Sequence, residues 1–166
     1  NSEGSNPRVL AARQLPQAFW CPAWSPDGAR IAAQALNLDA TGKYSTLVSI
    51  PVQGGAEQPI GTQRWQQVHG LHWLPTGQHL ALAATEVGTD GQQLWRISFP
   101  QGVAQRLTND PALYREPSPG AAGRLLAAVQ RETLDTIWVA PVENFTDRRM
   151  AVRGGRIGGL AWTPAD

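Results

Sequence analysis

Three histidines lie close together in the sequence and are the first residues to test for metal chemistry. His69, His72 and His79 are the only histidines of the chain. Side chains alternate along a strand, so His69 and His72 would point to opposite faces, with His79 beyond a turn. The spacing lacks the HExxH pattern of zinc sites, and the single cysteine, Cys21, excludes a CxxC pair. We therefore expect no metal site.

Residues suited to nucleophilic or cofactor chemistry are dispersed. A serine hydrolase needs a nucleophile, a base and an orienting group, and its GxSxG motif does not occur in the chain. The repeat pattern described below indicates turn or strand hydroxyls for the serines and a buried apolar role for Cys21. Paired glycines such as Gly54 and Gly55 form neither a GxGxxG motif nor a phosphate-binding loop. The sequence predicts a protein that is not an enzyme and has no cofactor.

Composition excludes further classes of protein. The 166 residues are 42% apolar and 16% charged, which is enough for a domain with a core. The 14 Lys and Arg and 13 Asp and Glu residues are spread evenly and give a net charge of +1, so we expect no nucleic-acid partner. The apolar runs are far shorter than the roughly 20 residues that span a bilayer, which predicts no membrane insertion of this segment.

The elements that would position a functional side chain come from an internal repeat. Trp24-Ser-Pro-Asp-Gly28 precedes an apolar stretch, Trp73-Leu-Pro-Thr-Gly77 does the same, and a weaker copy ends at Gly123. These glycines are 49 and 46 residues apart. In the second copy, alternating apolar residues and turn residues predict strands at 68–73, 79–84, 93–99 and 104–108. A period in the forties made of strands is typical of β-propeller blades.

The predicted fold class is all-β, a β-propeller fragment of about three complete four-stranded blades with partial blades at both ends. One propeller region would cover residues 1–166, with the end of a preceding blade at 1–15, blades at 16–62, 63–110 and 111–153, and the start of a further blade at 154–166. A closed ring needs four to eight blades. We therefore expect either self-association or missing blades supplied by a longer chain.

Tryptophans repeat at fixed phases, which indicates packing between blades. Trp24, Trp73 and Trp162 share one position, and Trp95 and Trp138 share another. In the third copy Pro119 replaces the tryptophan and Ala122 the aspartate, so we expect an irregular first turn there. Trp20 and Trp65 do not follow the repeat phase, and we expect them on the connections rather than in the core.

The repeat resembles a known family of propellers. The stretch from Pro22 to Ala32, PAWSPDGARIA, with the later Gly54 and Gly55, is similar to the TolB-type, WD40-like (PD40) repeat of bacterial proteins, and the likeness covers nearly the whole chain. The region from Leu107 to Pro141 also resembles propeller regions attached to bacterial serine/threonine receptor kinases and winged-helix regulators. These resemblances imply a ligand-binding or sensor module of a larger bacterial signalling or envelope protein, and favour an extracytoplasmic location in the periplasm or at the cell surface.

Candidate binding residues lie on the connections expected at one end of the blades. Aromatic and charged side chains on the loops of a rigid scaffold are typical of binding surfaces. We expect one propeller face to bind a protein, peptide or small-molecule ligand. The alternative is a substrate-gating propeller of a prolyl-oligopeptidase-like serine peptidase, with its catalytic domain outside this chain. The candidates are Trp20, Tyr44, Arg64, Trp65, Glu86, Tyr114, Arg115 and Arg131.

Overall fold

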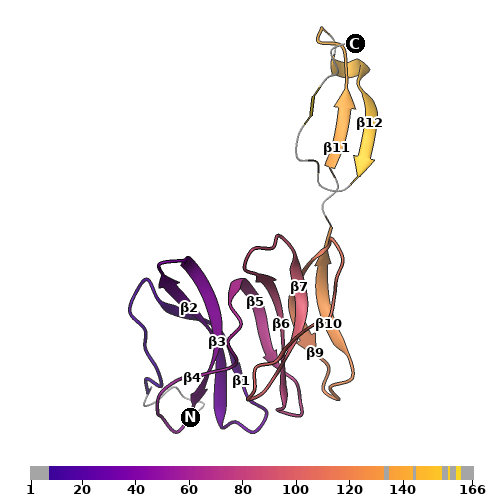
Figure 1. Ribbon diagram of the computed structural model, residues 1–166. Coiled ribbons are helices and arrows are strands. Elements are labelled where there is room, and N and C mark those ends of the chain that lie inside the picture. The colour runs from indigo at the N-terminus through magenta and orange to yellow at the C-terminus, as the bar shows by residue number, and fades with distance from the viewer. Residues whose placement is uncertain (1–7, 133–134, 144, 155–156, 158–159, 162–166) are drawn as a thin grey trace. The chain divides into compact units, whose positions relative to one another are not determined.

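A computed structural model describes residues 8–132, 135–143, 145–154, 157 and 160–161, and shows an all-β protein (Figure 1). The chain divides into two compact units, one ending at Arg131 and the other beginning at Glu132. Apart from strands, the described residues contain a single turn of 3-10 helix, η1 (Phe145–Asp147). This confirms the predicted fold class.

The first unit contains two four-stranded antiparallel blades and a hairpin. Blade 1 consists of β1 (Ala18–Trp24), β2 (Arg30–Asp39), β3 (Gly42–Pro51) and β4 (Gln58–Pro59), and blade 2 of β5 (Trp65–Trp73), β6 (His79–Glu86), β7 (Gln92–Ser98) and β8 (Ala104–Arg106). Strands follow one another in order within each blade, and the pairing of Ser45 with Trp65 joins the blades in one sheet. β9 (Leu113–Pro119) and β10 (Leu126–Arg131) form the hairpin. The four strands predicted for the second repeat are all present.

The repeat is visible in the backbone as well as in the sequence. Gly28, Gly77 and Gly123 all have a φ near +70°, at 68, 71 and 67°. In the third copy the Gly123 amide donates to the Gly120 carbonyl at 2.8 Å, as the Gly77 amide does to Leu74 at 2.9 Å. The expectation of an irregular first turn in the third copy was therefore wrong, because Gly123 keeps the positive φ that shapes this turn.

A second position repeats seven residues before each of these glycines. Cys21, Gly70 and Glu116 have φ values of 50, 68 and 48°, each within the first strand of a repeat. Each lies where the pairing of that strand with the next one shifts register, as in a β-bulge. A Cβ on Gly70 would lie 2.8 Å from Cδ of Pro117, so glycine is needed there for β9 to approach β5.

The main core lies between blade 1 and blade 2. Trp73 is 7% exposed, its indole N–H donates to the Ala23 carbonyl at 3.0 Å, and its ring meets Phe99 edge to face. Trp95 is equally buried and packs against Trp65 with ring centroids 4.9 Å apart. Trp73 thus confirms the predicted packing between blades, and Trp95 belongs to the same core, although its ring contact with Trp65 lies within blade 2.

Two other tryptophans differ from the sequence-based expectation. Trp24 is 60% exposed, because no blade covers the side of blade 1 on which it lies in the described chain. Trp138 is 46% exposed, and the Arg148 guanidinium carbon lies 5.3 Å from its ring centroid. Assigning these two residues to the core was wrong. Trp162 lies outside the described residues.

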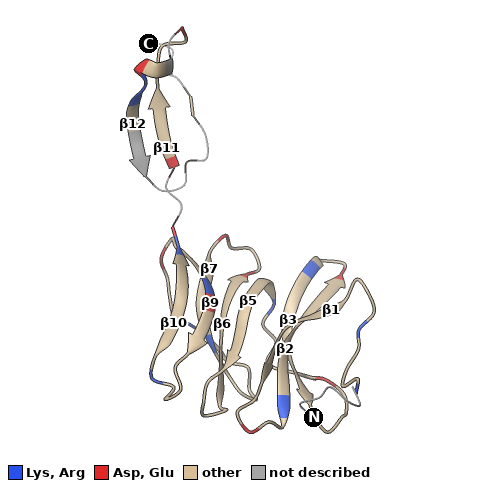
Figure 2. Cartoon of the chain, turned by 180° about the vertical axis from the view of Figure 1, so that it is seen from behind, with Lys and Arg blue, Asp and Glu red and all other residues tan. Residues whose placement is uncertain are grey.

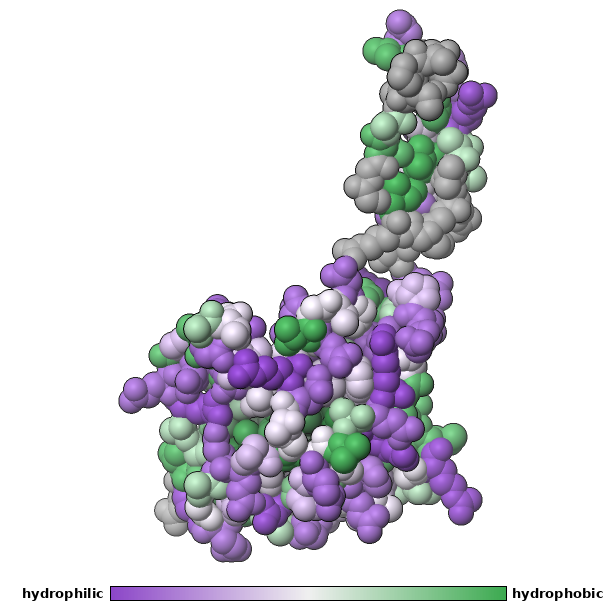
Figure 3. Space-filling view, in the orientation of Figure 1, coloured by the Kyte–Doolittle hydropathy of each residue, from purple (hydrophilic) through white to green (hydrophobic). Residues whose placement is uncertain are grey.

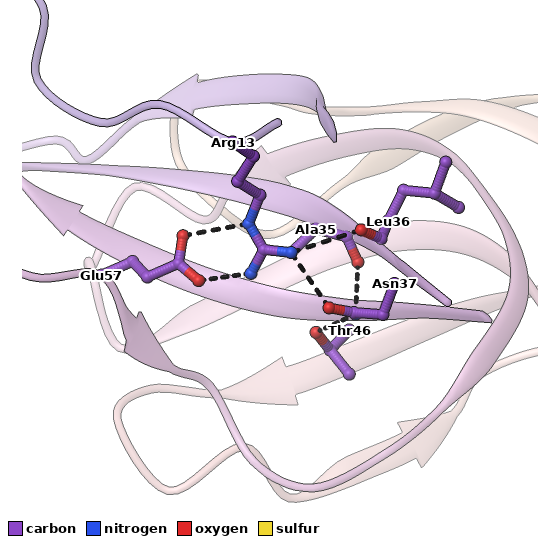
Figure 4. Close-up of polar contacts among 6 residues, drawn as sticks. All are labelled: Arg13, Ala35, Leu36, Asn37, Thr46 and Glu57. Carbon is purple, nitrogen blue, oxygen red and sulfur yellow. Dashed lines mark hydrogen bonds and ion pairs between the residues drawn. The ribbon is translucent and has the colours of Figure 1, made fainter. Parts of the chain in front are cut away.

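The segment before β1 packs on blade 1 as an irregular strip. Leu10 and Ala11 contact a cluster formed by Ala33, Val48 and other residues of the blade. Arg13 anchors the strip: it pairs with the Glu57 carboxylate and donates to the Leu36 carbonyl and Asn37 Oδ1 (Figure 4). Residues 8–14 form no strand, unlike the end of a preceding blade that we expected here.

The third repeat is shared between the two units. Its first two strands, β9 and β10, belong to the first unit, where β9 packs on β5, β6 and β7. The second unit contains β11 (Asp135–Val139), which pairs with β12 (Arg149–Gly154) in a separate two-stranded sheet. The four strands expected for this repeat are therefore present as two hairpins.

Candidate functional site

The candidate surface lies where connections from two blades meet. Asp39 pairs with Gly42 at the turn between β2 and β3. Ser45 of β3 and Glu86 at the end of β6 both pair with Trp65, the first residue of β5. The register thus brings the β2–β3 turn, the β4–β5 connection and the end of β6 together.

Arg64 is the centre of this surface. Its Nη1 lies 3.1 Å from Asp39 Oδ2 and 3.3 Å from Thr41 Oγ1. Its guanidinium carbon lies 3.9 Å from the centroid of the Tyr44 ring, a cation–π contact. Two predicted residues, Tyr44 and Arg64, are therefore in direct contact, and we call them with Asp39 and Thr41 the Arg64 cluster.

The β2–β3 turn holds the acidic member of the Arg64 cluster. Asp39 Oδ1 accepts hydrogen bonds from the Thr41 hydroxyl at 2.5 Å and the Thr41 amide at 2.8 Å. These two bonds, the hydroxyl first, lower the pKa of Asp39 below its ordinary value of 3.8, and the Arg64 charge adds to the effect. The carboxylate is therefore ionised at neutral pH. Sequence analysis missed Asp39, although Asp-x-Thr-Gly is a recognisable turn pattern.

Glu86 belongs to the same surface through a neighbour of Arg64. Gln63 Nε2 donates to Glu86 Oε1 at 3.2 Å and lies 3.3 Å from the Arg64 carbonyl oxygen. Blade 2 thus presents an acidic group beside the basic one from the blade connection. Tyr44, Arg64 and Glu86 are the three predicted residues that the structure brings together.

Trp65 is not part of the exposed surface. It is 0% exposed and packs against Trp95, because β5 begins three residues earlier than the predicted strand and carries Trp65 inside the sheet. The prediction that Trp65 lies on an exposed connection was wrong. It directly follows Arg64 and places the start of β5 in the core.

The remaining four candidates lie outside the Arg64 cluster. Trp20 is 59% exposed on β1, opposite Gln34, and Arg131 ends β10 opposite Leu113. The Tyr114 hydroxyl donates to Asp110 Oδ2 at 2.7 Å. The candidates as a whole do not form one contiguous site.

Arg115 lies near a histidine that sequence analysis considered only as a metal ligand. His69 of β5 is half-buried, and its burial, with the nearby Arg115 charge, lowers the pKa of its imidazole, against a smaller opposite effect of Glu116. The Arg115 Nε is buried without a hydrogen-bond partner in the described part of the chain. Trp20, His69 and Arg115 each directly precede a positive-φ residue of the repeat.

A shallow pocket of about 400 Å³ lies at the turns that follow β1 and β5. Asp27 and Arg30 contribute charges of opposite sign, and Trp73 and Phe99 contribute aromatic rings. The Asp27 carboxylate accepts from the Ser25 hydroxyl and the Ala29 amide, which lower its pKa below 3.8. Arg30 donates to Ser49 of β3 and Gln58 of β4, so the two charged groups of this pocket are engaged in contacts within the fold.

Charge and apolar side chains are distributed without a dominant patch. Basic and acidic residues are scattered over both blades (Figure 2). Hydrophilic side chains prevail on the face of the first unit seen in Figure 3, with separate apolar patches between them. Within the described ranges, no three His, Cys, Asp or Glu side chains gather as a metal site. No helix found in those ranges has the length and apolar character needed to cross a membrane.

The fold and the repeated blade geometry define a β-propeller protein. Among solved structures, the chain is similar to a putative TolB from Agrobacterium tumefaciens, with a TM-score of 0.61 and 19% identity over 93% of this chain. It also matches TolB from Acinetobacter baumannii, with a TM-score of 0.46 and 12% identity over 93% of this chain. The match to the Agrobacterium structure shows the fold alone. This fold is a TolB-type propeller, as the repeat predicted.

The chain spans 56% of the length of the Agrobacterium protein and 46% of that of the Acinetobacter protein. No family model matches the chain. No curated protein matches it either. The resemblance to propellers of receptor kinases and winged-helix regulators is not shown by these comparisons.

Proposed function

We propose that the chain is a non-enzymatic binding module that recognises a protein or peptide through the Arg64 cluster and Glu86. The module belongs to a larger bacterial envelope or signalling protein and works outside the cytoplasm. Its role is to hold a partner, since the sequence contains no GxSxG motif or zinc-binding pattern that would supply a reaction. The TolB-type fold supports a binding role, while the choice of surface rests on the residues below.

The observation that carries the proposal is the fixed position of Arg64 between two blades. The guanidinium is held by Asp39 and Thr41 and stacks on Tyr44, so little side-chain entropy remains to be lost on binding. Arginine and tyrosine are the residue types that dominate binding energy at protein interfaces. A prearranged pair of them on loops of a rigid sheet is therefore the best binding feature of the described surface.

The charges of the surface indicate the character of the partner. Arg64 forms an ion pair with Asp39, and Gln63 beside it donates to Glu86. The surface therefore presents positive and negative charges within one network of contacts. A partner with paired charges and an apolar or aromatic group to lie beside Tyr44 fits this pattern. We expect association to weaken moderately with salt, because the charged groups are exposed and screened.

The test compares capture of partners by matched variants. Wild-type protein, a Tyr44→Ala/Arg64→Ala variant and an Arg96→Ala control are immobilised and exposed to a bacterial envelope extract, and each captured protein is then purified and titrated by calorimetry. Arg96 is an exposed arginine of β7 whose guanidinium donates to Gln105 Oε1, so its replacement removes the same charge away from the cluster. We expect a partner that binds the wild type and R96A equally, and the double variant at least about tenfold more weakly. Equal binding to all three proteins would contradict the proposal.

A further inference from the structure

The pocket at the turns that follow β1 and β5 lies between blades 1 and 2. Blade 1 contributes Asp27 and Arg30, and blade 2 contributes Trp73, Thr76 and Phe99. Both blades belong to the first unit, and every residue that lines the pocket is described. The volume of about 400 Å³ is near the lower end of the range of small-molecule sites, about 300–1,000 Å³. The pocket therefore has room for a small ligand.

The two charges of this pocket are not required by the repeated turn. Asp27 directly precedes the turn glycine, Gly28, and Arg30 follows that glycine by two residues. The same positions of the other two copies hold Thr76 with His79 and Ala122 with Leu125. Those copies keep the turn at Gly77 and Gly123 without an acid and a base at these positions. The Asp27–Arg30 pair is therefore a feature of this pocket alone among the three copies.

Asp27 has one carboxylate oxygen left for a ligand. The Ser25 hydroxyl and the Ala29 amide both donate to Oδ1, at 2.5 and 3.0 Å. These bonds, the hydroxyl first, lower the pKa of Asp27 below its ordinary value of 3.8, so the group is ionised at neutral pH. Because both bonds use Oδ1, Oδ2 can accept a charge-assisted hydrogen bond from a ligand ammonium group.

Arg30 has a free edge on its guanidinium. Nη1 donates to Ser49 Oγ at 3.2 Å and to Gln58 Oε1 at 3.0 Å, and the guanidinium carbon lies 5.8 Å from the centroid of the Phe99 ring. These contacts fix the position of the group. In the described part of the chain they leave Nε and Nη2 without a hydrogen-bond partner. These two nitrogens form the planar fork that fits a carboxylate.

Aromatic rings and prolines form the apolar part of the pocket. Phe99 is half-buried and meets Trp73 edge to face, with ring centroids 4.8 Å apart. Pro26 and Pro75 line the pocket from the two turns. An apolar group of a ligand would lie against these side chains and lose contact with water.

We propose that this pocket binds a small zwitterion of the α-amino acid type with an apolar side chain. The ligand carboxylate pairs with Arg30, its ammonium group pairs with Asp27 Oδ2, and its side chain lies against Phe99. A ligand with a single charge leaves one charge of the pocket unpaired, which disfavours it. The site is separate from the Arg64 cluster, because Arg64 precedes the start of β5 and the pocket lies beyond its end.

The first test uses the wild-type protein and three related compounds. L-leucine, its methyl ester and N-acetyl-L-leucine are titrated while the indole N–H of Trp73 is followed by NMR, since Trp73 lines the pocket. We expect saturable shifts with L-leucine at a Kd on the order of 1 mM, as for a small ligand in a shallow site. Each derivative keeps one charge and should bind at least about tenfold more weakly. Absence of saturable shifts with L-leucine, or equal binding of the three compounds, overturns the proposal.

The second test assigns the two charges with matched variants. Asp27→Asn keeps an oxygen that accepts from Ser25 and Ala29, and Arg30→Gln keeps a side-chain amide in place of the guanidinium. The controls Asp90→Asn and Arg96→Gln remove the same charges at exposed positions outside the pocket.

Circular dichroism checks that all four variants are folded. We expect both controls to bind L-leucine as the wild type does, and D27N and R30Q to bind it at least about fivefold more weakly. D27N should no longer distinguish L-leucine from the N-acetyl compound, and R30Q should no longer distinguish it from the methyl ester. A folded D27N or R30Q that binds L-leucine as tightly as its control overturns the proposed site.

Discussion

Burial at the level of single residues reverses what the sequence predicts for two tryptophans. Trp24 lies at a repeated position and Trp65 does not, yet Trp65 is 0% and Trp24 60% exposed. Trp65 packs on Trp95 and lies where blade 1 and blade 2 pair. It is therefore a central part of the core, while Trp24 is a surface residue of this unit.

This contrast gives a prediction for stability. Trp65→Ala should lower the free energy of unfolding by about 3–5 kcal/mol, because it empties a packed aromatic site. Trp24→Ala should cost much less, since the exposed part of its ring loses little contact with the fold. Urea unfolding followed by circular dichroism, at a concentration low enough for monomers, measures both changes. Similar midpoints for the two variants would mean that the burial of Trp65 is wrong.

The half-buried His69 predicts a pH dependence. Burial, followed by the Arg115 charge, lowers the pKa of the imidazole in the folded protein below its ordinary value of 6.5. The unfolded chain therefore binds a proton at higher pH than the folded one, so stability is greatest above pH 6.5 and falls as the pH decreases below it.

The substitution His69→Gln removes this titration. Unfolding in urea between pH 5 and 7 should show a smaller loss of stability for H69Q than for the wild type, because the variant has no imidazole to protonate. An NMR titration of the His69 ring measures its pKa directly. Identical pH profiles for the two proteins would contradict the lowered pKa of the half-buried His69.

At the level of elements, a close approach of two connections holds the blades together. Gly61 follows β4, and Gly102 lies in the turn between β7 and β8. A Cβ on Gly102 would lie 2.1 Å from Cα of Gly61, a distance at which the backbone has to move. The absence of a side chain at Gly102 is thus required by packing as well as by its φ of 72°.

Two glycine substitutions separate these effects. Gly28→Ala and Gly102→Ala impose the same backbone strain, because φ is 68° and 72°, but a Cβ on Gly28 meets nothing within 4 Å. We expect G28A to cost about 1–2 kcal/mol and G102A about 1–3 kcal/mol more. Thermal unfolding of the two variants measures the difference. Equal melting temperatures for G28A and G102A would show that Gly102 does not lie against Gly61.

The strands were predictable because their residues repeat, while the site was not. In blade 2 the turn at Pro75 and Gly77 and the alternation after His79 place each strand within a few residues. The start of β5 was predicted at Val68, and this error of three residues moved Trp65 from the core to the surface. The contact of Arg64 with Asp39 depends on how the β2–β3 turn bends toward the β4–β5 connection, which no local pattern encodes. Tyr44, Arg64 and Glu86 were found only as residue types on loops.

At the level of the molecule, each repeat is one layer that becomes stable by contact with the next. Trp73, Leu80 and Leu82 of blade 2 are buried only because Ala32 and Leu47 of blade 1 lie opposite in the same core. The same logic explains why Trp24 and Val129 remain exposed in the first unit, where a neighbouring layer is not described. Repetition in the sequence thus determines which surfaces pack between the described blades.

The Trp73 indole proton tests the central claim, that consecutive repeats pack as propeller blades, most directly. Its N–H donates to the Ala23 carbonyl across the contact between blades 1 and 2, at 3.0 Å, while Trp24 at the same position of blade 1 is 60% exposed. Hydrogen exchange of the indole protons, followed by NMR, should show strong protection of Trp73 and fast exchange of Trp24 at a concentration where the chain is monomeric. Fast exchange at Trp73, equal to that at Trp24, would contradict the blade contact and the propeller architecture built on it.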